Sequence, residues 1–291
     1  MGAKLLNSFL KSKFPRTIQK KHWEWLSGKK IAIDTNNYIY KFLSEDNLIG
    51  GFIRMCDMFR YYNIIPLFIF DGKPSKQKNK ELKERKEMKK EAKKIYNEKK
   101  YMTNKEKIEL KRKFVNVTEN ETNIVKELLH AYGMKFMNAP EESDELCCKL
   151  VNIDKVYACL SEDMDMFIYG CKRILRCYSN CNYIYIYNIN IILQNLNLTL
   201  YEFKYLVLVS NIKENIFKIY KKYKENYYNF TNLLNNEEFK KIETQINYYN
   251  LEKSDVLSKC NYILIKLYNY NKMYVNLLRR KLPQELHFCP T

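Results

Sequence analysis

The sequence predicts an α/β fold in which a mainly parallel central sheet carries helices on both faces. The first observation is an alternation: apolar runs of strand length, as in residues 64–70, follow stretches with helical spacing, as in residues 52–62. The second is that acidic residues stand where apolar runs end. Because the carboxyl ends of parallel strands meet at one crevice of such a sheet, we expect these acids to lie close together. They are Asp34, Asp71, Glu142, Asp144, Asp163 and Asp165.

The elements of the first part of the chain follow in order. Residues 30–34 are predicted to form a short buried strand that ends at Asp34, and the residues after it have the spacing of a helix. Residues 52–62 form the next predicted helix, and residues 64–70 form a second buried strand that ends at Asp71.

The segment of residues 73–113 differs from the rest of the chain in charge. It contains 18 Lys and Arg against 7 Asp and Glu, and so carries +11 of the formal net charge of +18. Glu81 stands four residues before Arg85, a spacing that supports helix. We expect a basic helical hairpin, which is either a solvated charged surface or, because it directly follows Asp71, a surface that faces nucleic acid.

The later elements alternate in the same way. Residues 118–132 are predicted to form an amphipathic helix closed by Gly133. Pro140 is expected to open another helix, with Glu142 and Asp144 in its first turn. Residues 134–137, 156–160 and 173–187 have strand patterns, and the chain from residue 199 onward has helical spacing.

Composition favours nucleic acid as the partner, because the net charge is +18 and the pI is about 9.3. An anionic membrane surface is the competing partner, but no apolar run approaches the roughly 20 residues of a membrane-spanning helix. Nine cysteines without a C-x-x-C pair indicate reduced thiols in a reducing compartment rather than a zinc site. We therefore expect a soluble intracellular protein.

The six acidic residues together indicate divalent metal. Carboxylates at close range either take up protons or bind cations. The histidines, His22, His130 and His287, stand singly along the chain and offer no histidine-based alternative. Surrounded by Lys and Arg, such a site is typical of a Mg²⁺-dependent enzyme that acts on nucleic-acid phosphates.

Five short motifs stand in order along roughly residues 1–215. They are Met1-Gly2-Ala-Lys-Leu-Leu, Ile31-Ala-Ile-Asp34-Thr-Asn-Asn-Tyr-Ile-Tyr40, Phe68-Ile-Phe-Asp71-Gly-Lys73-Pro74, Ala139-Pro140-Glu-Glu142-Ser-Asp144 and Ser161-Glu-Asp163-Met-Asp165. Together they resemble the signatures of the flap endonuclease / XPG-type structure-specific 5′ nuclease family. The resemblance implies that family's PIN-like fold, and it places the basic segment after Asp71 where the family has a helical arch that a single-stranded 5′ flap threads.

The resemblance also implies catalytic roles. The six acidic residues match the family's metal ligands, which hold two Mg²⁺ ions that Mn²⁺ can replace, and Asp34 and Asp71 count among the catalytic residues. Lys78 and Arg85 match the cations at the base of the arch that contact the scissile phosphate. For these two cations the alternative is one more solvated positive charge in a run.

Further residues are implied to bind DNA. Tyr40 matches an aromatic residue that stacks on a base beside the cleaved bond, and its alternative role is a half-buried core tyrosine. Gly2 and Lys73 stand in matching motifs and are expected to contact DNA as well.

Two positions depart from the family pattern. Asn211 stands where a seventh carboxylate is expected, so we predict a metal ligand that acts through its amide oxygen or through water, with weaker affinity for the second ion. Downstream, the family has a helix–hairpin–helix with a Gly-x-Gly turn, whereas this chain has no glycine after Gly170. Lys218, Lys221 and Lys222 are expected to bind DNA there by charge instead.

We therefore predict a nuclease domain over residues 1–225, with its arch at about 73–115, and a divergent helical C-terminal extension over 226–291 that packs on it. The leading function is a Mg²⁺-dependent 5′ nuclease that cuts DNA near junctions of single strand and duplex in replication, repair or recombination. One alternative is a catalytically weakened DNA-binding scaffold, and a second is a PIN-type ribonuclease.

The expected partner is DNA with a 5′ flap or junction, bound by a monomer. No sliding-clamp-binding peptide is visible, and no membrane association is expected. The expected location is the nucleus or a cytoplasmic site of DNA replication, as in a large DNA virus with an AT-rich genome.

Overall fold

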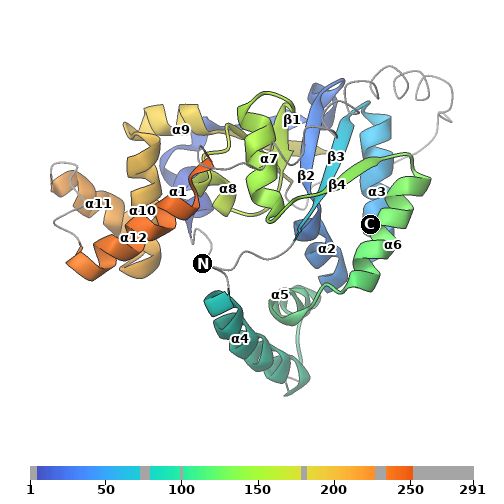
Figure 1. The fold of residues 1–291 in the computed structure, drawn as a ribbon, viewed down its shortest axis with the longest axis horizontal. Helices are drawn as coiled ribbons and strands as arrows, with labels where there is room; N and C mark the ends of the chain where they lie inside the picture. The colour runs from blue at the N-terminus through green and yellow to red at the C-terminus, as the bar shows by residue number, and fades with distance from the viewer. Residues whose placement is uncertain (1–4, 73–78, 99–100, 178–181, 227–233, 252–291) are drawn as a thin grey trace.

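The computed structural model describes residues 5–72, 79–98, 101–177, 182–226 and 234–251. In these residues a seven-stranded sheet lies between two layers of helices (Figure 1). The strands are β1 Ile18–His22, β2 Lys30–Asp34, β3 Ile65–Phe70, β4 Lys135–Asn138, β5 Ala158–Leu160, β6 Arg173–Arg176 and β7 Tyr183–Asn188. The helices are α1 Leu6–Lys13, α2 Thr35–Ser44, α3 Leu48–Tyr61, α4 Asn79–Glu98, α5 Asn104–Phe114, α6 Glu119–Ala131, α7 Ser143–Asn152, α8 Asp165–Ile168, α9 Ile189–Leu196, α10 Leu200–Ile212, α11 Ile216–Glu225 and α12 Asn236–Tyr248, with short 3₁₀ helices at Pro15–Thr17 and Trp23–Leu26.

The strand order in the sheet is β1-β7-β6-β5-β2-β3-β4. The pairings β2–β3, β2–β5, β3–β4 and β5–β6 are parallel, whereas β7 is antiparallel to both of its neighbours, β6 and β1. The prediction of an α/β fold with a mainly parallel sheet is confirmed. The edge strand β1 was not predicted from the sequence.

Helices cover both faces of the central strands. Ala32, Leu67 and Ile69 face a core formed with α1 and α7–α12. Ile33 and Phe68, the next residues along the same strands, face a second core formed with α2, α3 and α6. Because both faces are covered, every residue of β3 is buried, which explains its continuous apolar sequence.

The helix after β4 begins later than predicted. It starts at Ser143 with Glu142 as its N-cap, and not at Pro140. The backbone N–H of Ala139 donates to the carbonyl of Phe70 (2.7 Å), and that of Gly72 donates to the carbonyl of Glu141 (2.6 Å). These bonds hold the chain extended beside the end of β3, so the first helical turn forms only after they end.

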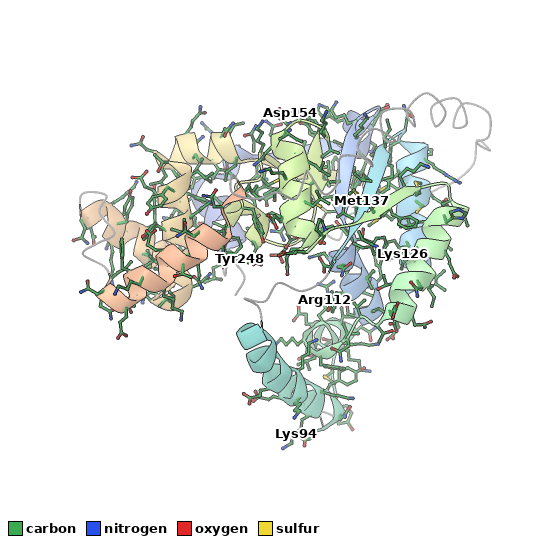
Figure 2. All side chains as sticks on the ribbon, viewed as in Figure 1. Lys94, Arg112, Lys126, Met137, Asp154 and Tyr248 are labelled. Carbon is green, nitrogen blue, oxygen red and sulfur yellow. The ribbon has the colours of Figure 1, made fainter. Side chains whose placement is uncertain are left out.

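The basic segment forms a helical hairpin of α4 and α5 that projects from the body beside α2 (Figure 1). Its second helix is anchored: Arg112 Nη2 lies 3.2 Å from Glu45 Oε1, and Lys111 pairs with Asp46. Lys90, Lys93 and Lys94 are exposed on α4, and Figure 2 shows Lys94 at the far end of the hairpin from Arg112. Within the predicted arch, α4 and α5 are helical and residues 101–103 between them are described without helix.

The C-terminal helices pack on one another at the opposite end of the sheet from α3 and α6 (Figure 1). Residues 213–215 join α10 to α11, and no glycine stands in this connection. The side chain of Asn215 caps α11 by accepting a hydrogen bond from the backbone N–H of Lys218 (3.1 Å). Helix α12 packs on α10, while residues 252–291 lie outside the described residues, so the domain boundary at residue 225 stays a prediction. No helix within the described ranges is both long and apolar enough to cross a membrane.

Candidate metal centre

The predicted acidic residues lie together at the carboxyl ends of the central parallel strands. Asp34 is the last residue of β2, and Asp71 follows β3 directly. Asp163 follows β5, and Asp165 is the first residue of α8. Glu142 caps α7, and Asp144 lies in the first turn of that helix.

A serine hydroxyl joins the first two aspartates. Ser143 Oγ lies 3.1 Å from Asp34 Oδ1 and 2.7 Å from Asp71 Oδ1. The backbone N–H of Ser143 donates to the same oxygen of Asp71 (2.9 Å). Asn36 Nδ2 donates to the other oxygen, Asp71 Oδ2 (2.7 Å), so both carboxylate oxygens of Asp71 are held.

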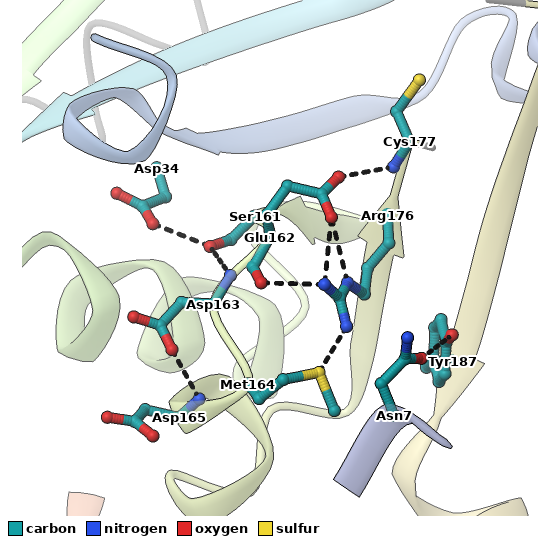
Figure 3. Close-up of polar contacts among 10 residues, drawn as sticks. All are labelled: Asn7, Asp34, Ser161, Glu162, Asp163, Met164, Asp165, Arg176, Cys177 and Tyr187. Carbon is teal, nitrogen blue, oxygen red and sulfur yellow. Dashed lines mark hydrogen bonds and ion pairs between the residues drawn. The ribbon is translucent and has the colours of Figure 1, made fainter. Parts of the chain in front are cut away.

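A second serine continues the chain of contacts toward α8 (Figure 3). Ser161 Oγ donates to Asp34 Oδ2 (2.7 Å) and accepts from the backbone N–H of Asp163 (3.0 Å). Asp163 Oδ1 in turn accepts from the backbone N–H of Asp165 (2.9 Å). Asp34 is therefore connected to Asp71 through Ser143 and to the loop of Asp163 through Ser161.

Gly72 permits the close approach that joins these elements. A Cβ atom at this position would lie 2.1 Å from the carbonyl oxygen of Ala139 and 2.6 Å from that of Pro140. Any side chain would therefore push the loop before α7 away from the end of β3, and with it Ser143 away from Asp71.

Burial and neighbouring carboxylates raise the pKa of two of the aspartates. Burial raises the pKa of Asp34 to about 7, helped by the negative charges of Asp71 and Asp163, while the serine hydrogen bonds act in the opposite direction. Burial also raises the pKa of Asp144 well above its usual value, with further contributions from Asp34, Asp163, Asp71 and Asp165. Five of the six predicted acids thus interact directly.

Glu142 adjoins this group through a tyrosine. Tyr169 is buried, and burial raises its pKa, with added contributions from the negative charges of Asp144 and Glu142. Glu142 and Asp144 therefore act on the same neighbour.

An ion pair fixes the loop that carries Asp163 and Asp165 (Figure 3). Arg176, a buried residue of β6, binds Glu162 Oε2 through Nε (3.2 Å) and Nη2 (3.0 Å), and it also binds the carbonyl of Glu162 (2.9 Å). The other carboxylate oxygen of Glu162 accepts from the backbone N–H of Cys177 (2.8 Å). The loop is thereby tied to the sheet on the side away from the aspartates.

The residues present suit a hard divalent cation. Carboxylate oxygens are the ligands that Mg²⁺ prefers. Asp144 Oδ1 is buried and has no hydrogen-bond partner, which leaves a carboxyl oxygen that a cation could satisfy. Within the described residues no three His, Cys, Asp or Glu side chains are already arranged around one point as a metal-binding group. Serine and asparagine donors hold the oxygens of Asp34 and Asp71, so binding an ion requires some of these hydrogen bonds to be exchanged.

Two other predicted site residues, Tyr40 and Asn211, lie on helices beside the acidic group. Tyr40 lies on α2 and is 39% exposed, so part of its ring is accessible, and its stacking role stays a prediction. Asn211 lies in the last turn of α10, a helix that packs against α8. Its role as a ligand stays a prediction.

The lysines of α11 are exposed, as DNA-binding residues must be. Lys221 lies 3.6 Å from Glu225 and Lys222 lies 2.7 Å from Glu214. Exposed pairs of this kind are weak, and the DNA-binding role of these lysines stays a prediction. Gly2, Lys73 and Lys78 lie outside the described residues; Arg85 lies on α4, and its side chain is not described.

The sequence did not predict the uncharged and cationic residues whose hydrogen bonds hold the acidic residues and their loop in place. These are Asn36, Ser143, Ser161 and Arg176. Ser143 stands between two predicted ligands and Ser161 stands two residues before another, and that proximity was the available signal. Arg176 had none, since its partner is recognisable only from the fold.

Comparison with known sequences decides the family. The XPG N-terminal domain matches residues 1–92, and the XPG I-region matches residues 133–212, which together make up more than half of the chain. The chain belongs to the XPG family. Its matched regions contain all six acidic residues and exclude most of the α4–α5 hairpin.

Curated relatives of this XPG-family chain include flap endonucleases. Flap endonuclease 1 of Candida glabrata is 33% identical over 224 residues, which cover 70% of this chain and 58% of that protein. Flap endonuclease 1 of Drosophila persimilis is 38% identical over 193 residues, which cover 60% of this chain and 50% of that protein. The chain thus spans about half to three fifths of the length of these relatives.

Solved structures share the fold. The catalytic core of Rad2 in complex with a DNA substrate has a TM-score of 0.59 at 24% identity, covering 95% of this chain and 82% of that chain. Flap endonuclease-1 from Methanococcus jannaschii has a TM-score of 0.59 at 22% identity, covering 91% of this chain and 97% of that chain. The predicted PIN-like α/β fold agrees with these neighbours.

Proposed function

We propose that this chain is a Mg²⁺-dependent, structure-specific nuclease that hydrolyses DNA near the junction of a single-stranded 5′ end and duplex, in replication, repair or recombination. The observation that carries the proposal is the group of aspartates at the carboxyl ends of the parallel strands, where Asp34 is connected to Asp71 through Ser143 and to the loop of Asp163 through Ser161. The flap endonuclease relatives support the choice of substrate class. Nucleases of this family generally depend on divalent metal ions.

The chain's own residues account for the chemistry. Bound divalent ions supply charge neutralisation at the scissile phosphate and lower the pKa of an attacking water. The residues that would hold such ions are Asp34, Asp71, Glu142, Asp144, Asp163 and Asp165. The Glu162–Arg176 pair keeps the loop of Asp163 in place without adding a ligand.

Substrate binding is assigned to the basic surfaces. The exposed lysines of α4 and α11 would contact phosphates, and Tyr40 would stack on a base. Action as a monomer on flap or junction DNA is part of this proposal.

The proposal is tested with the purified chain and Mg²⁺ on end-labelled flap, nicked and single-stranded substrates of equal length. We expect the flap or nicked junction to be cut near its branch point and the single strand to be cut poorly. Junction binding without cleavage of any DNA would support the scaffold alternative. Preferential cleavage of single-stranded RNA would support the ribonuclease alternative.

The buried charge of Asp144 predicts an effect on stability. Without divalent ions and at alkaline pH, Asp144→Asn is expected to raise the melting temperature, because burial and the neighbouring aspartates disfavour the charged form of Asp144. Its Oδ1 also has no hydrogen-bond partner, which costs about 1–3 kcal/mol, and each kcal/mol shifts the melting temperature by roughly 2–4 °C. Mg²⁺ should raise the melting temperature of the wild type and raise that of Asp144→Asn much less. Thermal melts with and without Mg²⁺ check this. A lower melting temperature for metal-free Asp144→Asn than for the wild type would count against the assignment.

Asn211 offers a separate prediction about the second ion. If its amide occupies a ligand position, Asn211→Asp adds a charged oxygen and should lower the Mg²⁺ concentration needed for half-maximal cleavage. A Mg²⁺ titration of cleavage, run side by side on both proteins, measures this. The same half-maximal concentration in both would place Asn211 away from the metal centre.

A further inference from the structure

Asp34 is bracketed by two buried hydroxyl groups. Ser143 Oγ approaches its Oδ1 (3.1 Å), and Ser161 Oγ approaches its Oδ2 (2.7 Å). Ser143 and Ser161 are 2% and 0% exposed, so water does not compete for these contacts. The two serines lie at the starts of different segments, one in α7 and one after β5.

The two serines are not equivalent. The Ser161 hydroxyl uses both its proton and its oxygen. The proton is donated to Asp34, and the oxygen accepts a hydrogen bond from the backbone N–H of Asp163. Ser143 has one hydroxyl proton and two carboxylate oxygens within reach, those of Asp34 and Asp71. It can therefore donate to one of them at a time.

The contacts around Ser143 are also unequal. Asp71 Oδ1 receives the shorter hydroxyl contact (2.7 Å) together with the backbone N–H of Ser143 (2.9 Å). Asp34 Oδ1 has the longer contact to the Ser143 hydroxyl (3.1 Å). Its other contact is a marginal one of 3.5 Å from the backbone N–H of Asn37. Of the four oxygens on the two carboxylates, Asp34 Oδ1 is thus the one that can be released at least cost.

We propose that Ser143 is a positioning residue of the metal centre, an inference that rests on the proposed function. Its hydroxyl lies between the facing oxygens of Asp34 and Asp71, which are therefore no more than 5.8 Å apart, the sum of its two distances. With an ion bound, Ser143 would keep its proton and its bonds to Asp71, and Asp34 Oδ1 would be the oxygen available to hold the ion. Asp34 stays oriented through Ser161.

The test measures metal binding by the full chain directly. Melting temperatures are recorded across a Mg²⁺ titration for the wild type, Ser143→Ala and Ser143→Thr. Because residues that orient metal ligands typically contribute about 10–100-fold in metal affinity, Ser143→Ala should need at least about tenfold more Mg²⁺ for its half-maximal stabilisation. Ser143→Thr restores the hydroxyl and should return close to the wild-type value. Thr17→Val removes another buried hydroxyl, which donates to the carbonyl of Phe14 next to β1, and should leave the Mg²⁺ midpoint unchanged.

The outcomes separate this inference from the proposed function. Wild-type Mg²⁺ midpoints in Ser143→Ala, with cleavage and stabilisation intact in the wild type, would overturn the role of Ser143 alone. A threonine variant as weak as the alanine variant would overturn it too, because the hydroxyl would then not be the active feature. No stabilisation of the wild type by Mg²⁺ would overturn both the inference and the metal-dependent function.

Discussion

Asp34→Asn is expected to reduce the rate of 5′ flap cleavage by at least about 10³-fold. A metal centre stabilises the transition state by several kcal/mol, and each 1.36 kcal/mol of lost stabilisation lowers the rate about tenfold. Asp34 connects the two halves of the centre through Ser143 and Ser161. Asparagine keeps the shape of the side chain but removes the charge that a cation needs. DNA binding should change little, since Lys and Arg contacts to phosphates supply the affinity.

Single-turnover cleavage and fluorescence anisotropy on the same flap DNA measure the two quantities separately. Asp154→Asn is the matched control, because Asp154 is an exposed aspartate paired with Lys172 and Arg173 beyond the C-terminal end of α7 (Figure 2). The control should cleave at the wild-type rate. If Asp34→Asn also cleaves at the wild-type rate, the assignment of the metal centre is wrong.

Arg85→Ala is expected to slow the chemical step by about 10²–10³-fold, the usual cost of losing one well-placed donor to transition-state charge. Its effect on binding should be small, because one cation among the many of this basic hairpin changes the overall field little. Lys78→Ala should behave in the same way. The anchoring of α5 through Arg112 and Glu45 would keep the hairpin in place in these variants.

The same helix offers the control for the hairpin variants. Lys94 is exposed on α4 and lies 3.9 Å from Glu98, so Lys94→Ala removes an equal charge from a position with no assigned contact to the scissile phosphate. We expect a cleavage rate near that of the wild type for Lys94→Ala. Equal cleavage rates for Arg85→Ala and Lys94→Ala would show that Arg85 is a solvated surface charge without a role at the scissile phosphate.

The buried parallel strands could be predicted because their sequences are continuous apolar runs, as in β2 and β3. Strand β1 could not, since its sequence, Ile-Gln-Lys-Lys-His, is largely polar and its pairing partner, β7, lies far along the chain. The start of α7 was misplaced for a similar reason. Backbone bonds from the end of β3 hold the residues around Pro140 extended, and no local pattern reports such bonds.

The acidic residues of the centre could be predicted because each one follows an apolar run or opens a helix. The hydroxyl groups that connect them could not. Ser143 and Ser161 stand 109 and 127 positions from Asp34 in the chain, and a single serine has no periodicity to mark it. Lys78 and Arg85 came from the family resemblance alone, and the described side chains do not include them.

The central claim is that this carboxylate centre holds the ions that cut DNA, and a joint Mg²⁺ titration tests it most directly. Flap cleavage by the wild type and its melting temperature are measured over the same Mg²⁺ concentrations, starting from protein freed of metal with a chelator. We predict no cleavage without Mg²⁺ and a rise of both signals together as the ions bind. Undiminished cleavage in the presence of excess chelator would contradict the account.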